Sequence, residues 1–88
     1  MKYNKKKFIY LISPSRINNV FFDDLHDVLK SNKVSFFQLR LKKESFKKKF
    51  TIGKKIKKIC KKFDVKFLIN DDVLLAKKLD ADGCHLGQ

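Results

Sequence analysis

Residues 36–42 read FFQLRLK, and this short stretch carries the pattern that decides the fold. Side chains of an extended strand alternate between two faces. One face then carries three apolar side chains, those of Phe37, Leu39 and Leu41. The other face carries three hydrogen-bond donors, those of Gln38, Arg40 and Lys42. The stretch predicts a strand with one face in a core and a second face suited to binding phosphate oxygens. A half-exposed strand with two solvated cations is the alternative at this point.

Strand-like and helix-like segments alternate on both sides of this stretch. Apolar runs at 8–12 and 65–69 predict two further strands, and a fourth is expected within 82–88. Helices are expected after Asn18 or Asn19, after Ser45 and over 73–79, where Asp72 is the expected cap. Strands separated by crossover helices form a parallel sheet. The sequence therefore predicts an α/β fold of four parallel strands with three intervening helices.

The composition indicates one small domain with a strongly basic surface. The chain has 88 residues, a hydrophobic content of 43% and a net charge of +13. Of the 22 basic residues only Arg16 and Arg40 are arginine. Proteins that read bases favour arginine for bidentate contacts, so specific nucleic-acid recognition is disfavoured. A small basic nucleic-acid-binding module nevertheless stays open as the alternative function, and nonspecific binding would weaken steeply with salt.

Cysteine spacing and hydropathy favour a cytoplasmic protein. Cys60 and Cys84 form no C-x-x-C pair, so neither a zinc site nor a disulfide framework is indicated. The apolar run at 8–12 is shorter than the core of a secretion signal, and no segment is long enough to span a membrane. The lysine-rich helix after Ser45 has an apolar stripe, and a membrane-surface helix is the alternative for it.

Polar side chains gather where the predicted strands end. The second strand carries Gln38, Arg40 and Lys42, the third ends at Asn70 and Asp71, and His85 and Gln88 lie in and after the fourth. Parallel α/β folds place their chemistry at the carboxyl ends of the strands. A carboxylate beside phosphate-binding cations favours a bridging Mg²⁺, which prefers oxygen ligands and keeps substrate phosphate in its shell.

Together these blocks resemble the amino-terminal half of thiamine-phosphate synthase, a TIM-barrel enzyme. The matching features are the YLI strand, the Q-x-R-x-K pattern at 38–42, the run INDDV at 69–73 and the run ADGCHLGQ at 81–88. They extend over essentially the whole chain and occur in the family's order and spacing. The resemblance implies a partial TIM (β/α)8 barrel domain over residues 1–88.

The resemblance also implies a reaction and a set of site residues. The enzyme joins 4-amino-2-methyl-5-hydroxymethylpyrimidine diphosphate to a thiazole phosphate, releasing thiamine phosphate and pyrophosphate. By this resemblance Gln38, Arg40, Lys42 and Asn70 bind the pyrimidine diphosphate, Arg40 and Lys42 are catalytic, and Asp71 binds Mg²⁺. A relative of the thiazole tautomerase branch is the second alternative, and that branch tends to lose the diphosphate-binding pattern retained here.

The length of the chain carries an expectation of its own. A TIM barrel has eight strands, and four are predicted here. We expect a fragment that is inactive alone, with Gln38, Arg40 and Lys42 facing water because the inner face of the sheet is uncovered. Open sheet edges favour self-association or pairing with a complementary carboxyl-terminal half. The expected substrates are small phosphorylated molecules.

Overall fold

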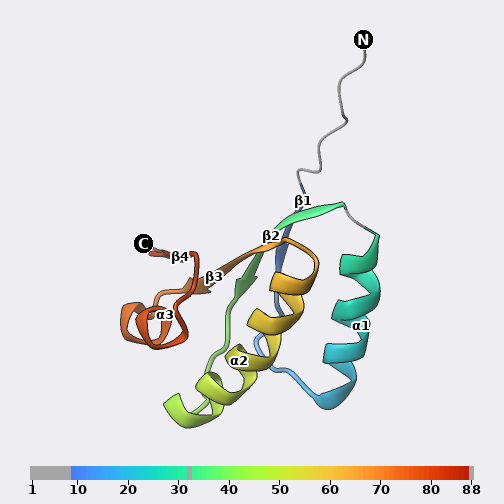
Figure 1. Ribbon diagram of the computed structural model, residues 1–88. Helices are drawn as coiled ribbons and strands as arrows, with labels where there is room; N and C mark the ends of the chain where they lie inside the picture. The colour runs from blue at the N-terminus through green and yellow to red at the C-terminus, as the bar shows by residue number, and fades with distance from the viewer. Residues whose placement is uncertain (1–8, 32, 88) are drawn as a thin grey trace.

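The computed structural model describes residues 9–31 and 33–87, so Phe8 of the first predicted strand and Gln88 lie outside it. The four strands are β1 (Ile9–Ile12), β2 (Val34–Leu39), β3 (Lys66–Asn70) and β4 (Gly83–His85). The three helices are α1 (Asn19–Lys30), α2 (Phe46–Lys62) and α3 (Val73–Leu79). The strands form one parallel sheet in the order β1-β2-β3-β4. The predicted α/β alternation is confirmed (Figure 1).

Each helix begins at a side chain that accepts a hydrogen bond from the first turn. The carboxamide of Asn18 accepts from Phe21 N at 3.1 Å, and the hydroxyl of Ser45 accepts from Lys48 N at 3.1 Å. The Asp72 carboxylate accepts from Leu75 N at 3.0 Å. These caps satisfy backbone donors that have no partner inside the helix. The predicted helix starts are confirmed, with Asn18 rather than Asn19 as the first cap.

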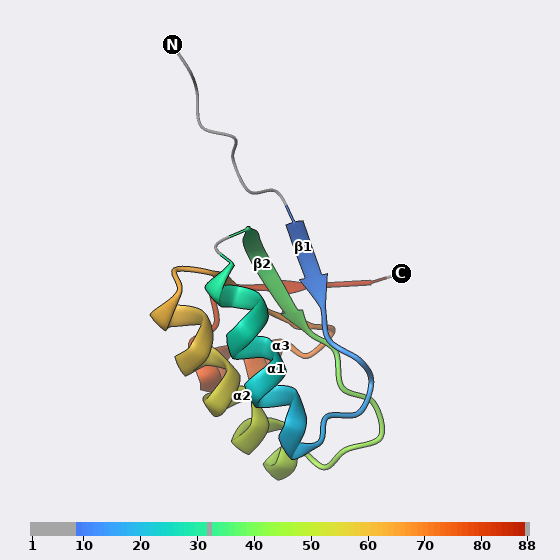
Figure 2. The same cartoon turned by 90° about the vertical axis from the view of Figure 1, so that its right-hand side faces the viewer.

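The helices cover one face of the sheet. Figure 2 shows α1 and α2 on one side of β1 and β2, with the opposite side bare. The core lies between these layers and contains Phe37 and Leu39 of β2, Phe67 and Ile69 of β3, and Ile56 of α2, none more than 2% exposed. A Cβ added at Gly53 on α2 would clash with Leu79 Cδ1 of α3, so the glycine permits the close approach of these two helices.

The second and third strands have other bounds than predicted. The third strand begins at Lys66 rather than Val65, because Val65 N donates to the carbonyl of Cys60 at the end of α2, at 2.9 Å. The second strand ends at Leu39 rather than Lys42. Beyond it Lys42 N donates to the carbonyl of Ser15 at 3.3 Å, and Lys43 has a φ of 60°. That backbone conformation cannot continue a strand. Within the described ranges, no helix has the length and apolar character needed to cross a bilayer.

Candidate functional site at the strand ends

The structure brings the predicted site residues to one edge of the sheet. Leu39 of β2 is the register partner of Ile69 of β3, so Arg40 and Asn70 directly follow paired positions. Asn70 is in turn the register partner of His85 in β4. Since the strands are parallel, their carboxyl ends meet at this edge. The predicted clustering at three neighbouring strand ends is therefore confirmed as an arrangement of the backbone.

Gln38 is buried, contrary to the expectation that it faces water. Its side chain is 4% exposed, and its amide nitrogen donates to the Tyr10 hydroxyl at 2.9 Å. The Tyr10 ring stacks on that of Phe36, with centroids 5.6 Å apart. Tyr10 lies on β1, and Ile12 of the same strand is the register partner of Gln38. The neighbouring strand therefore shields and orients the amide on the face that no helix covers.

Arg40 and Lys42 are exposed, as expected. Neither forms an ion pair with any residue of 9–31 or 33–87. Their backbone is nevertheless held by the loop that follows β1. The Ser13 hydroxyl accepts from Arg40 N at 2.8 Å, and Ser13 N donates to the carbonyl of Gln38 at 2.9 Å. The guanidinium and the ammonium thus project from a fixed backbone and have unused donors for an anion.

Asp71 is fixed in an unusual backbone conformation beside the fourth strand. Its φ is 58°, in the left-handed region that aspartate tolerates better than most residues. Its N–H donates to the carbonyl of His85 at 2.7 Å, and its Oδ1 accepts from Gly87 N at 2.7 Å. Among the described residues, the Asp71 carboxylate thus accepts a hydrogen bond through Oδ1, and its Oδ2 is available to a ligand.

A single available carboxylate oxygen is compatible with Mg²⁺. This ion is commonly held by one or two carboxylates, with water and substrate phosphates completing its octahedral shell. The described part of the chain contains no cluster of three acidic, histidine or cysteine side chains that would form a complete metal site. Asp71 and the half-buried Asn70 are the oxygen donors at this edge that fit the ion.

Two residues of the site were missed by sequence reasoning. Tyr10 lies within the apolar run at 8–12, and Ser13 directly follows that run. Both contact the segment 38–40 from positions 27 and 28 residues earlier in the chain. The only sequence signals are a hydroxyl within an apolar run and a serine directly after it, and both patterns are common in strands and turns. Their roles therefore depend on the pairing of β1 with β2, and the sequence pattern does not specify which residues of the two strands contact each other.

Comparisons with known proteins agree with this arrangement. A family model described as thiamine monophosphate synthase matches residues 9–88. Thiamine-phosphate synthase of Pelagibacter ubique is 70% identical, and the match covers the whole chain and 44% of that protein. Thiamine-phosphate synthase of Campylobacter jejuni (serotype O:2) is 39% identical, with 42% of its length covered. The chain thus spans less than half the length of these curated relatives.

A solved structure supports the fold independently. Thiamine phosphate pyrophosphorylase from Pyrococcus furiosus superposes with a TM-score of 0.77 and is 24% identical in sequence. The superposition covers 89% of this chain and 38% of that protein. The strand-helix order is that expected for the amino-terminal half of a TIM barrel. On the family match and on these likenesses, the chain belongs to the thiamine monophosphate synthase family.

Proposed function

We propose that this chain supplies the pyrimidine-diphosphate-binding part of a thiamine-phosphate synthase. The reaction is the transfer of a pyrimidinylmethyl group from its diphosphate to a thiazole phosphate, with release of pyrophosphate. The observation that carries the proposal is a backbone arrangement: Gln38, Arg40, Asn70 and Asp71 lie at, or directly after, the carboxyl ends of the adjacent strands β2 and β3. The name of the relative with 70% identity supports the same activity.

The proposed roles follow from the chemistry of each group. Arg40 and Lys42 bind the diphosphate and stabilise the negative charge that develops on it as the bond to the pyrimidinylmethyl carbon breaks. Gln38, oriented by Tyr10, donates to the substrate through its remaining amide hydrogen. Asn70 contributes its side-chain amide at the end of β3.

Asp71 is proposed as a ligand of Mg²⁺, through the oxygen that Gly87 does not occupy. When bound, the ion would neutralise charge on the leaving pyrophosphate. The hydrogen bond from Gly87 would keep the carboxylate oriented toward the substrate side of the sheet.

The experiment fuses this chain to the remaining carboxyl-terminal part of the Pelagibacter ubique relative and assays thiamine phosphate formation. Arg40→Ala should lower turnover by roughly 10²–10³-fold, the usual loss for a donor to developing charge. Lys33→Ala, which removes an exposed cation at the amino end of β2, is the matched control and should leave turnover unchanged. Asp71→Asn should raise the Mg²⁺ concentration needed for half-maximal rate.

Two results would contradict the proposal. Equal rates for the parent, Arg40→Ala and Asp71→Asn fusions would mean that the site lies elsewhere. Tautomerisation of a thiazole without coupling would assign the chain to the tautomerase branch. Retention of Gln38, Arg40, Lys42, Asn70 and Asp71 together favours the synthase.

A further inference from the structure

Helix α2 carries nine lysines and no acidic residue in FKKKFTIGKKIKKICKK. Its apolar stripe packs on the sheet, with Ile52, Ile56 and Cys60 at most 7% exposed. The lysines therefore occupy the face turned to solvent. A helix that binds a bilayer surface needs a free apolar face, and on α2 this face is already used by the core. The membrane-surface alternative for this helix is thus disfavoured.

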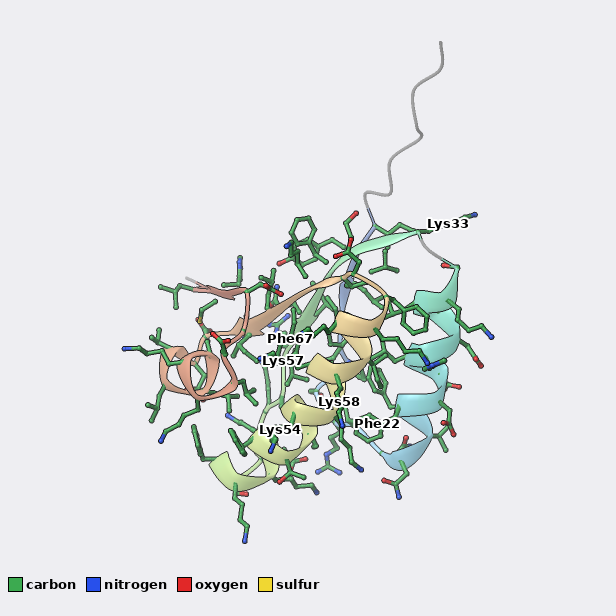
Figure 3. The ribbon with its side chains drawn as sticks, in the orientation of Figure 1. Phe22, Lys33, Lys54, Lys57, Lys58 and Phe67 are labelled. Carbon is green, nitrogen blue, oxygen red and sulfur yellow. The ribbon has the colours of Figure 1, made fainter. Side chains whose placement is uncertain are left out.

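A groove of about 810 Å³ lies between α2 and the end of α3. Its lining includes one carboxylate, that of Asp80. It also includes six lysines, namely Lys54, Lys55, Lys57, Lys58, Lys61 and Lys78. Figure 3 shows three of them, Lys54, Lys57 and Lys58, along α2. Such an excess of one charge along a hollow creates a local field that attracts anions.

The single carboxylate is already matched within the groove. Lys57 Nζ lies 3.9 Å from the Asp80 carboxylate and donates to the carbonyl of Leu79 at 2.9 Å. Among the residues that the structure describes, the other five lysines of the groove have no acidic partner, namely Lys54, Lys55, Lys58, Lys61 and Lys78. Five lysine charges therefore stay uncompensated along the groove, and an anionic ligand would relieve their mutual repulsion.

The spacing and the type of these cations fit a phosphodiester chain. Lys54, Lys58 and Lys61 recur at helical intervals and rise about 10 Å along one side of α2. Regularly spaced point charges match regularly spaced phosphates, whereas lysine lacks the planar fork that reads bases. A protein partner would need a pocket for an apolar anchor. In the groove Leu79 is 4% exposed, and Lys54 Nζ lies over the Phe50 ring, 5.6 Å from its centroid, so neither of these two side chains is freely open to such an anchor.

We propose that the α2–α3 groove binds the phosphodiester backbone of single-stranded RNA without reading its sequence. The site is separate from the strand-end site. Helix α2 begins after the carboxyl end of β2, and its last turns, which carry Lys58 and Lys61, lead to the amino end of β3. RNA binding at the groove therefore leaves the strand ends free. The RNA-binding proposal can fail without affecting the proposed enzymatic function, and the reverse also holds.

The test measures binding of a fluorescent 12-nucleotide oligouridylate by anisotropy, across a series of salt concentrations. The groove variant combines Lys54→Gln, Lys58→Gln and Lys61→Gln. The control variant combines three exposed lysines outside the groove, Lys30→Gln, Lys33→Gln and Lys47→Gln, and removes the same charge. The slope of log K against log salt concentration is negative, and its magnitude should decrease by about two in the groove variant. This is roughly 0.7 for each of the three phosphate contacts removed. Affinity should fall about tenfold or more, and the control should stay within about twofold of the parent.

Several outcomes would overturn the proposal. Equal losses in the two variants would mean that net charge, and not the groove, holds the RNA. Stronger competition by polyglutamate than by unlabelled oligouridylate would assign the groove to acidic proteins, and preferential binding to phosphatidylglycerol vesicles would assign it to lipid. Circular dichroism checks that both variants keep their helices. If the groove variant does not, Lys58→Gln alone replaces it, with an expected slope change of about 0.7.

Discussion

On the helix side of the sheet Phe37 and Phe67 are 0% and 1% exposed, whereas on the opposite side Tyr10 and Phe36 are 44% and 39% exposed. All four are aromatic residues on strands of the same sheet, so residue type does not explain the difference in exposure. The helices bury one face, and that burial supplies most of the apolar stabilisation. On the other face, the Gln38 amide donates a hydrogen bond to the Tyr10 hydroxyl, and the Tyr10 ring stacks on Phe36. Stability and candidate chemistry thus lie on different faces of one sheet.

The largest expected effect compares one phenylalanine from each face. Phe67→Ala should lower the free energy of unfolding by about 3–5 kcal/mol, because it leaves a cavity between the sheet and α2. Phe36→Ala should cost about 1 kcal/mol, since it removes mainly the stack on Tyr10. Urea unfolding followed by circular dichroism measures both values. Equal losses would mean that the open face is packed as tightly as the helix side.

The second prediction concerns the buried hydroxyl at the end of β1. Ser13→Ala should cost about 1–3 kcal/mol, because it leaves the N–H of Arg40 without its acceptor. Ser15→Ala is the control, since Ser15 is exposed and contacts Lys42 through its backbone carbonyl. Both are read from the same urea curves. A cost for Ser15→Ala as large as that for Ser13→Ala would contradict this account.

The third prediction uses the apolar side chains of the open face. We expect the 88-residue chain to self-associate through this face, because Ile12 there is 48% exposed beside Tyr10 and Phe36. Ile12→Lys should weaken the association about tenfold, or about 1.4 kcal/mol. Val20→Lys on α1, where the side chain is 60% exposed, is the matched control and should have no effect. Sedimentation equilibrium would refute the prediction if both variants dissociated equally.

The smallest expected effect is a pH dependence from the helix side. Burial, with a smaller contribution from Asp82, raises the pKa of Cys60 from 9.0 to about 12. Above pH 9 the unfolded thiol loses its proton while the folded thiol keeps it, so stability falls as the pH rises. The loss should reach about 1 kcal/mol near pH 9.5–10. Cys60→Ala should lack this part of the decline in urea unfolding, and an identical decline in both proteins would contradict the assignment.

The sequence predicts the strands, their parallel direction and the helix starts because these depend on local signals. Asn18, Ser45 and Asp72 are caps followed by apolar residues at helical spacing, and each is confirmed. The clustering of Gln38 and Asn70 at strand ends followed from the alternation of strands and helices. Such features need only neighbouring residues and the general geometry of a parallel sheet.

The remaining details depend on contacts between distant segments. The end of β2 at Leu39 is set by the loop after β1, through Ser13 and Ser15. The burial of Gln38 depends on the position of Tyr10, which no local pattern specifies. The lysine groove also could not be predicted, because the charges on α2 indicate only repulsion until α3 is placed beside them.

The sequential strand order has a consequence for how the chain acquires its structure. Each strand pairs with the strand made just before it, so each new strand-helix unit docks onto an edge that already exists. Translation proceeds at about 5–20 residues per second, slowly enough for units to order as they leave the ribosome. Parallel pairing requires closure of a loop as long as a helix and is intrinsically slow. Because the strands pair in chain order, each new strand has to find only one partner, the strand that precedes it.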